Sequence, residues 1–275
     1  MRPVEVVASD PLLPQSPALV FRLLGSGISY SASPVMMAAA FADLGLPHRY
    51  VLADVSAEEV PGILASLRED EAGGANVTTP HKALVASLVD ECSPDAQLAE
   101  AVNTVVRDGR RLVGHNTDLP ATVEVVEKLC PAGVAHAVVI GAGGAGRAVT
   151  LALARVGAGR ISVLRRSDGS MDRLTAQLIS ADLLVNATPV GTAGDASPVP
   201  TALLRPDLAV LDLVYRPSPT RLVREARATG APAAAGAGIL MGQAWRSLEF
   251  WLRAPAPIEV MREALRAELG ADADV

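Results

Sequence analysis

Hydrophobic residues along the chain fall into short runs that alternate with helical patterns. The runs predict strands at residues 19–25, 48–55, 73–77, 135–141, 160–166, 181–188 and 208–215. Apolar positions at helical spacing predict helices at residues 34–45, 56–70, 121–129, 145–157 and 220–230. Repeated βα units of this kind favour an α/β fold in which helices cover both faces of a parallel sheet.

A glycine-rich turn separates the strand at 135–141 from the helix after it. The stretch VVIGAGGAGRAV places Gly141, Gly143 and Gly146 in the pattern GxGxxG. The first glycine permits a tight turn, the second lets a pyrophosphate approach the backbone, and the third lets helix and strand pack closely. The helix N-terminus adds amide donors and a positive dipole end. Because a strand precedes the pattern and a helix and a second strand follow it, we expect dinucleotide binding rather than a chance glycine turn.

The end of that second strand bears on the choice of dinucleotide. NAD-binding proteins generally carry Asp or Glu there for the ribose 2′-hydroxyl, whereas this chain has Arg165, Arg166 and Ser167 and no carboxylate before Asp168. Guanidinium groups can bind a 2′-phosphate through paired hydrogen bonds. We therefore expect NADP rather than NAD. The alternative is that both arginines are solvated charges at the end of a strand.

Composition limits the class of protein. A chain of 275 residues, 50% of them hydrophobic and 20% charged, is expected to fold, and its length favours two domains. Aromatic residues make up only 3%, so the core must consist largely of Ala, Val and Leu. The net charge of −6 argues against general binding to nucleic acid or to anionic membranes. An anionic ligand would therefore need a local cationic site.

The cysteines and the N-terminal residues indicate a cytoplasmic protein. Cys92 and Cys130 lie in no metal-ligand spacing, and two unpatterned thiols are typical of a reducing compartment. We expect no metal site. The N-terminal stretch MRPVEVVASDPLLPQSPA has acidic residues and prolines where a signal peptide would have an apolar run, and no run is long enough to span a membrane. It predicts a loose N-terminal extension.

Lysine is nearly absent from the chain. Lys and Arg together number 24, yet only Lys82 and Lys128 are lysines. An ammonium can exchange a proton near neutral pH, whereas a guanidinium effectively cannot. Keeping Lys82 within NVTTPHK (76–82) therefore indicates a role for a transferable proton. The alternative is that this position remained lysine by chance.

Polar residues gather at the ends of several predicted strands. They are Ser29, Ser31, Ser33, Asn103, Asp118, Asp212, Tyr215 and Gln243. Hydroxyl groups, amides and a Lys/Asp couple suit a small polyhydroxylated acid, since each ligand hydroxyl needs a donor and an acceptor. Taken singly, these residues also have structural explanations, as turn-forming serines, a strand asparagine, a helix cap at Asp118 and a core tyrosine.

Taken together, the motifs resemble those of the shikimate dehydrogenase family. In chain order they read SxSP, NVTxPxK, AVNTV, GxNTD, GAGGAGRAV, NATPVG, LDLVYxPxxT and GxGxLxxQA, from about residue 24 to the region of Trp251. The resemblance implies the reversible, NADP-dependent reduction of 3-dehydroshikimate to shikimate in aromatic amino acid biosynthesis. One alternative is a quinate/shikimate or aminoshikimate dehydrogenase. Another is a non-catalytic paralogue that binds a dinucleotide or metabolite.

The resemblance also implies roles for individual residues. Lys82 and Asp118 match the family's catalytic couple. The implied substrate contacts are Ser31 and Ser33, which would bind a carboxylate, and Thr78, Asn103, Asp118, Tyr215 and Gln243, which would bind ring hydroxyls or close the pocket. The implied cofactor contacts are Gly141, Ala142, Gly143, Gly144, Ala145, Gly146, Arg165, Arg166, Ser167, Leu213 and Gly236.

The implied architecture has two domains, in a monomer or homodimer. A substrate domain would span residues 1–118 and be completed by helices at 239–275, and a Rossmann-type NADP-binding domain would span 119–238. Only about 15 residues follow Arg166 before the next strand, too few for the usual helix and additional strand. We therefore expect the NADP-binding domain to be trimmed at one sheet edge. Leu119 and Pro120 replace glycines common in the family, and proline is acceptable early in a helix.

Overall fold

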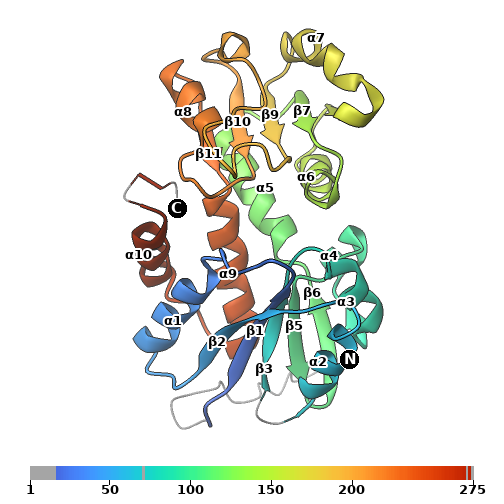
Figure 1. Ribbon diagram of the computed structural model, residues 1–275, viewed down its shortest axis with the longest axis vertical. Helices are drawn as coiled ribbons and strands as arrows, with labels where there is room; N and C mark the ends of the chain where they lie inside the picture. Colours follow the sequence, from blue (N-terminus) through green and yellow to red (C-terminus); the bar gives the residue numbers. More distant parts are fainter. Residues whose placement is uncertain (1–16, 70–71, 271, 274–275) are drawn as a thin grey trace, which may run out of the picture.

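Two β-sheets lie one above the other in the computed structural model, and helices pack on both of them (Figure 1). The structure describes residues 17–69, 72–270 and 272–273. The expected N-terminal extension falls mainly on residues 1–16, outside the described residues. Two long helices, α5 (Asp118–Leu129) and α9 (Ala237–Leu252), run between the regions of the two sheets.

The first sheet has six strands in the order β2-β1-β3-β5-β6-β4. They are β1 (Val20–Gly25), β2 (Arg49–Asp54), β3 (Ala72–Val77), β4 (Glu91–Cys92), β5 (Thr104–Asp108) and β6 (Arg111–His115). β1 pairs in parallel with β2 and β3, but β5 pairs antiparallel with β3 and β6, so the expectation of a parallel sheet is wrong here. The turn between β5 and β6 contains only Gly109, with a φ of 61°, and Arg110, and so short a connection joins antiparallel strands.

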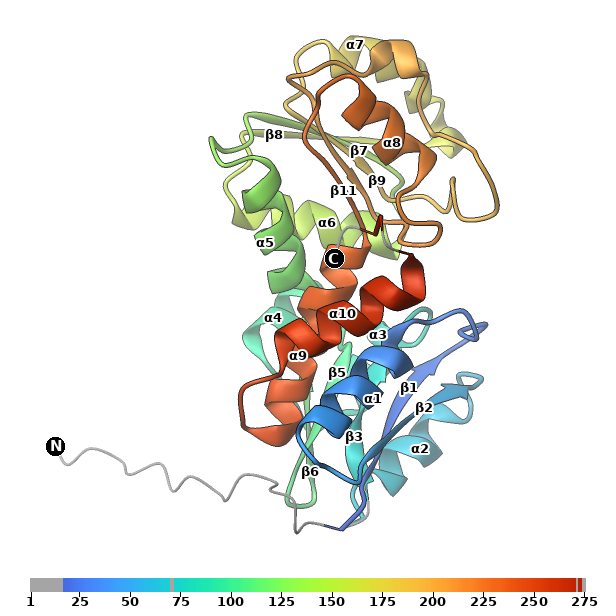
Figure 2. The same ribbon diagram turned by 90° about the vertical axis from the view of Figure 1, so that its left-hand side faces the viewer.

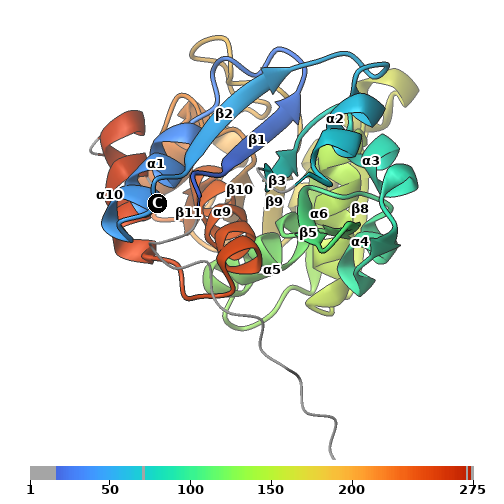
Figure 3. The ribbon, with the colours of Figure 1, turned by 90° about the horizontal axis from the view of Figure 1, so that it is seen from below.

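Helices cover both faces of the first sheet, and some of them come from the end of the chain (Figures 2 and 3). Besides α9 they are α1 (Ser33–Asp43), α2 (Val60–Ser66), α3 (Lys82–Leu88), α4 (Pro94–Ala99) and α10 (Ile258–Leu269). Side chains alternate along β1: Phe21 and Leu23 pack with α1, α9 and α10, whereas Leu24 packs with α2 and α3. The C-terminal helices therefore complete a core that the N-terminal strands begin.

The second sheet has five strands, all parallel, in the order β11-β10-β9-β7-β8. They are β7 (His136–Ile140), β8 (Arg160–Leu164), β9 (Leu183–Asn186), β10 (Ala209–Asp212) and β11 (Ala233–Ala235). Helices α5 and α6 (Gly144–Arg155) cover one apolar core, and α7 (Leu174–Leu178) and α8 (Arg221–Ala228) cover the other. For this half, a parallel sheet with helices on both faces is confirmed.

Strand β8 forms one edge of the second sheet. The chain between β8 and β9 forms two 3-10 turns, at Arg166–Asp168 and Ser170–Arg173, followed by the five-residue helix α7. This stretch is fully described and contains no further strand. The prediction that the second sheet is trimmed at one edge is confirmed, because a connection of this length has no room for both a standard helix and a further strand.

Several predicted elements are shorter than expected. The helix predicted at 56–70 is confined to α2, which ends at Ser66; before it, residues 57–59 form a turn in which the Ser56 amide donates to the Glu59 carboxylate at 2.8 Å. The strand predicted at 208–215 ends at Asp212, and Asn103 comes just before β5 rather than within it. Asp118 is the first residue of α5 rather than its cap.

Candidate active site

The side chains of Lys82 and Asp118 meet at the beginnings of two helices. Lys82 begins α3 and Asp118 begins α5, and Lys82 Nζ lies 2.5 Å from Asp118 Oδ2. Both side chains are partly exposed, at 29% and 22%. The positive end of the α5 dipole stabilises the carboxylate, whereas the positive end of α3 disfavours an ammonium, and the ion pair offsets that cost. The structure therefore brings the two predicted catalytic residues together.

Hydrogen bonds fix the chain directly before Asp118. The Thr117 amide donates to Asn103 Oδ1 at 2.8 Å, and Asn103 Nδ2 donates to Thr117 Oγ1 at 2.9 Å. Asn116 Oδ1 accepts a hydrogen bond from the Leu119 amide at 3.0 Å. Asn103, expected to contact substrate, is buried and uses its oxygen and one of its two N–H groups to hold this segment.

A buried polar network that the sequence analysis misses supports the same segment. Tyr50 OH donates to Asn76 Oδ1 at 2.8 Å, and Asn76 Nδ2 donates to Ser247 Oγ at 2.9 Å. Ser247 Oγ also lies 2.8 Å from Thr104 Oγ1 and 3.3 Å from Thr117 Oγ1. A satisfied buried network favours one arrangement of its members, so it ties β2, β3, β5 and α9 to the residue before Asp118. The one signal in the sequence is the presence of polar residues within apolar strands.

Ser31, Ser33 and Thr78 lie at the same edge of the first sheet as Lys82. The serines follow β1, Thr78 and Lys82 follow β3, and these two strands are parallel neighbours. Ser31 Oγ lies 3.3 Å from Ser33 Oγ. Since the carboxyl ends of parallel strands meet at one sheet edge, the structure gathers three hydroxyl groups and an ammonium there.

Tyr215 reaches this edge from the other half of the chain. Its ring centroid lies 6.3 Å from that of Tyr30, the residue directly before Ser31. Burial raises the pKa of Tyr215 to about 12. The phenol therefore keeps its proton at neutral pH and can donate a hydrogen bond. The structure therefore places Tyr215 beside the segment that carries the two serines.

Gln243 lies on α9 where this helix packs closely on α5. A Cβ at the neighbouring Gly242 would lie 2.9 Å from the Cβ of Ala121, in the first turn of α5. Gln243 is 9% exposed, and its Nε2 donates to the Leu240 carbonyl at 3.0 Å. The close packing places Gln243 near the helix start that carries Asp118.

The glycine turn after β7 is closed at its two ends and open in its middle. Gly141 has a φ of 107°, and a Cβ there would lie 2.8 Å from the Ala187 carbonyl oxygen. A Cβ at Gly146 would lie 2.1 Å from the Gly141 oxygen, whereas a Cβ at Gly143 or Gly144 would meet nothing within 4 Å. With Ala142 and Ala145, these residues lead into the twelve-residue helix α6. The open middle and the helix N-terminus suit a pyrophosphate.

Leu213 and Gly236 lie against each other at the same edge of the second sheet. They follow β10 and β11, and a Cβ at Gly236 would lie 2.2 Å from the Leu213 carbonyl oxygen. Only glycine permits this approach of the two backbones. The structure therefore places both predicted cofactor residues at the strand ends that lie on the same side as the glycine turn.

Arg165, Arg166 and Ser167 are exposed in the turn after β8. The Gly141 amide donates to the Leu164 carbonyl at 2.8 Å, so this turn adjoins the glycine turn. The side chains of Arg165, Arg166 and Ser167 are accessible to a ligand that lies along the edge of the second sheet. The structure therefore brings the predicted cofactor residues to one place.

Comparison with known proteins identifies the family. Residues 23–105 match the family described as shikimate dehydrogenase substrate binding domain. A protein of Natronomonas pharaonis named shikimate dehydrogenase (NADP(+)) is 39% identical over 264 residues, which cover 91% of this chain and 99% of that protein. The chain belongs to the shikimate dehydrogenase family. The predicted resemblance is thereby confirmed.

Solved structures of shikimate dehydrogenases share the fold. The enzyme of Thermus thermophilus, described in complex with NADP(H) and shikimate, is 38% identical with a TM-score of 0.81, covering 91% of this chain and 100% of that one. The enzyme of Listeria monocytogenes, described in complex with shikimate and NAD, is 28% identical with a TM-score of 0.79, covering 90% of this chain and 96% of that one. Structures in this group are therefore described with either dinucleotide.

Asp212 organises the segment that carries Leu213 and Tyr215 in this shikimate dehydrogenase family member. Its Oδ1 accepts hydrogen bonds from Asn186 Nδ2 at 2.8 Å and from the Val214 amide at 3.1 Å. Its Oδ2 accepts a hydrogen bond from Thr220 Oγ1 at 2.8 Å. Burial raises the pKa of Asp212, and these donors oppose the rise. The carboxylate therefore fixes the chain from the end of β10 to the start of α8.

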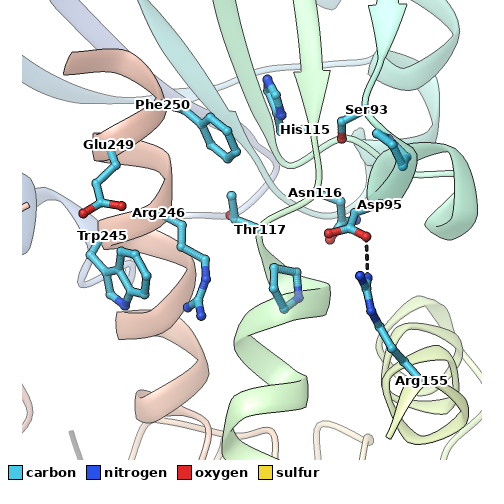
Figure 4. A pocket seen from close by; sticks show the side chains of 12 residues that line it. Ser93, Asp95, His115, Asn116, Thr117, Arg155, Trp245, Arg246, Glu249 and Phe250 are labelled. Atoms are coloured by element: carbon cyan, nitrogen blue, oxygen red, sulfur yellow. Dashed lines mark hydrogen bonds and ion pairs between the residues drawn. The ribbon is translucent and has the colours of Figure 1, made fainter. Parts of the chain in front are cut away.

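A hollow of about 730 Å³ lies beside the segment that leads to Asp118, between α4, α9 and the C-terminal end of α6 (Figure 4). The His115 ring stacks on Phe250 with 4.0 Å between centroids, and Arg155 forms an ion pair with Asp95 across the two halves. Lys82 and Asp118 are not among its lining residues. The hollow is therefore distinct from the candidate active site of this shikimate dehydrogenase relative.

The described part of the chain has neither a cluster of metal ligands nor a membrane-spanning helix. Within it, no group of three or more His, Cys, Asp or Glu side chains could hold a metal ion. None of its helices is long and apolar enough to cross a membrane. Cys92 and Cys130 are both free thiols.

Proposed function

We propose that this chain catalyses the reversible reduction of 3-dehydroshikimate to shikimate with NADPH. The observation that carries the proposal is the contact of Lys82 Nζ with Asp118 Oδ2 at 2.5 Å, at the sheet edge that also carries Ser31. The related Thermus enzyme is described with NADP(H) and shikimate bound. A non-catalytic paralogue would have no need for a couple able to transfer a proton.

The catalytic roles follow from the chemistry of the two side chains. Bound NADPH supplies the hydride. The oxygen of the ring carbonyl gains negative charge as the carbonyl is reduced, and the Lys82 ammonium stabilises that charge and donates a proton to it. Asp118 holds the Lys82 side chain in an ion pair and accepts a hydrogen bond from a neighbouring substrate hydroxyl. General acid catalysis of this kind contributes about 10²–10⁴-fold in rate.

The polar groups at this edge of the first sheet would hold the substrate. Ser31 and Ser33 would bind the carboxylate, since hydroxyl groups donate to carboxylate oxygens. The residues proposed to bind ring hydroxyls or to close the pocket are Thr78, Asn103, Asp118, Tyr215 and Gln243. The retained proton of the Tyr215 phenol and the contact of its ring with Tyr30, beside Ser31, support its role.

The cofactor would lie along the corresponding edge of the second sheet. The glycine turn 141–146 would bind the pyrophosphate, and Arg165, Arg166 and Ser167 would bind the 2′-phosphate of NADP. Leu213 and Gly236 would contact the dinucleotide beside them. The open space at Gly143 and Gly144 supports this arrangement.

The two halves would act as domains. We infer a substrate domain of residues 1–118 completed by 239–275, and a cofactor domain of residues 119–238, with the reaction between them. The packing of α10 on α1 supports this division. A cytoplasmic location agrees with the two free thiols, and a monomer or homodimer remains our expectation for the assembly.

The proposal is tested by the absorbance of NADPH at 340 nm, with purified protein and each acid in turn. We expect reduction of NADP⁺ with shikimate, and slower reduction with quinate or aminoshikimate. A higher rate with quinate or aminoshikimate would replace the proposed substrate. If circular dichroism shows a folded α/β chain and NADP⁺ is not reduced with any of the three acids, the non-catalytic paralogue is favoured.

A further inference from the structure

The turn after β8 contains an acidic residue as well as the two arginines. Arg165 Nε lies 3.1 Å from Asp168 Oδ2, and the two side chains are 52% and 49% exposed. The carboxylate therefore engages one of the guanidinium groups expected to bind a 2′-phosphate. The two arginines alone would give the turn a formal charge of two positive units. With Asp168 included, the net formal charge is one positive unit.

Ser170 holds this acidic residue in place. The Ser170 amide donates to Asp168 Oδ1 at 3.0 Å, and Ser170 Oγ accepts from the Arg165 amide at 2.8 Å. Gly169, with a φ of 71°, provides the left-handed conformation that closes the turn. Hydrogen bonds from Ser170 lower the pKa of Asp168, so the carboxylate is charged at neutral pH. The hydrogen bonds of the turn therefore hold Asp168 where it can pair with Arg165.

We propose that Asp168 is a specificity-determining residue that weakens the preference of this chain for NADP over NAD by engaging Arg165. The inference rests on the proposed function, because it assumes that the turn after β8 meets the adenosine ribose. Solved relatives are described in one case with NADP(H) and in another with NAD.

The physical reason is competition between two anions for one guanidinium. A 2′-phosphate carries negative charge and needs Arg165 N–H groups, of which the carboxylate already engages one. The carboxylate also repels a phosphate that lies within about one Debye length, roughly 8–10 Å at moderate ionic strength. NAD carries no 2′-phosphate, so neither effect acts on it. Removing the charge of Asp168 should therefore strengthen NADP binding selectively.

The test is Asp168→Asn, with Asp172→Asn as the matched control. An asparagine oxygen can still accept from the Ser170 amide, so the turn is retained. Asp172 is exposed in the following 3-10 turn, and its substitution makes the same change of charge outside the ion pair. Titration calorimetry would measure binding of NADP⁺, NAD⁺ and adenosine 2′-monophosphate, which requires no turnover.

We expect Asp168→Asn to bind NADP⁺ and adenosine 2′-monophosphate about three- to ten-fold more tightly, with NAD⁺ changed less than about two-fold. Raising the salt concentration should shrink the gain, which a purely structural effect would not do. In an Arg165→Gln background the gain should also shrink, since the competition acts through Arg165.

Two results would overturn the inference in different ways. Wild-type protein that binds NADP⁺, with an NADP⁺/NAD⁺ affinity ratio that Asp168→Asn leaves unchanged or lowers, would refute the role of Asp168 alone. A gain of equal size in Asp172→Asn would also refute it, because general charge would then be the cause. Wild-type protein that binds neither dinucleotide would refute the proposed function and the inference together.

Discussion

Replacement of Lys82 by arginine separates charge from proton transfer at the candidate active site. Two unit charges 4 Å apart interact by about 1 kcal/mol in water and about 4 kcal/mol at an effective dielectric constant of 20. The Lys82 and Asp118 side chains are closer than this and only 29% and 22% exposed, so solvent screens their attraction less than that of a fully exposed pair. A guanidinium can keep this attraction but cannot give up its proton near neutral pH. Lys82→Arg should therefore retain most of the binding and lose most of the turnover.

The expected loss in Lys82→Arg is about 10²–10⁴-fold in kcat, or about 3–5 kcal/mol of barrier, with a much smaller change in KM for shikimate. Initial rates at 340 nm with shikimate and NADP⁺ would measure both constants. Lys128→Arg is the matched control, because Lys128 is 72% exposed and is paired with Glu124 at the far end of α5. A kcat for Lys82→Arg close to that of Lys128→Arg would refute proton transfer by Lys82.

Three further predictions concern the glycine turn, the buried network and the tyrosine. Gly146→Ala should unfold at clearly lower urea concentration than Gly143→Ala, since an added Cβ meets the Gly141 oxygen at 2.1 Å in the first and nothing within 4 Å in the second. Ser247→Ala should lower the free energy of unfolding by about 1–3 kcal/mol in urea titrations, because it leaves buried partners unsatisfied. Since burial raises the pKa of Tyr215 to about 12, the unfolded chain loses this proton first as pH rises from about 10, the ordinary value. Stability should therefore fall between these pH values in the wild type and less so in Tyr215→Phe, as thermal unfolding at each pH would show.

Local patterns predicted four of the five strands of the second sheet, but not the three-residue strand β11. The continuous apolar strand before Gly141 and the Ala-rich helix after Gly146 are signals that neighbouring residues create, so they are visible in the sequence. The short stretch after Arg166 likewise predicted the absence of a strand beyond β8, which the sheet order confirms. Chain length alone carries that information.

Contacts between distant residues could not be predicted in the same way. Asn76 and Ser247 are 171 residues apart, and their hydrogen bond depends on α9 packing on the first sheet. The helical pattern of the last 40 or so residues does not specify that surface. Strand β6 and its antiparallel pairing with β5 were also missed, although Asp108 and Gly109 are a turn signal between two apolar runs.

The candidate site could be predicted from the sequence only in part. Lys82 and Asp118 stood out by residue type and motif, but their contact depends on two helix starts that the sequence alone did not locate: α3 was not predicted, and α5 begins three residues earlier than expected. The pairing of Arg165 with Asp168 was likewise not visible from spacing, since residues three apart meet only when the chain turns between them.

The central claim is tested most directly by identifying the product that the wild-type protein forms from shikimate. Mass spectrometry would follow the acid while absorbance at 340 nm follows the cofactor in the same reaction with NADP⁺. The account predicts that 3-dehydroshikimate appears in equal amount with NADPH, and that both are lost together in Lys82→Arg. Folded wild-type protein that leaves shikimate unchanged, or that forms NADPH with no matching 3-dehydroshikimate, would contradict it.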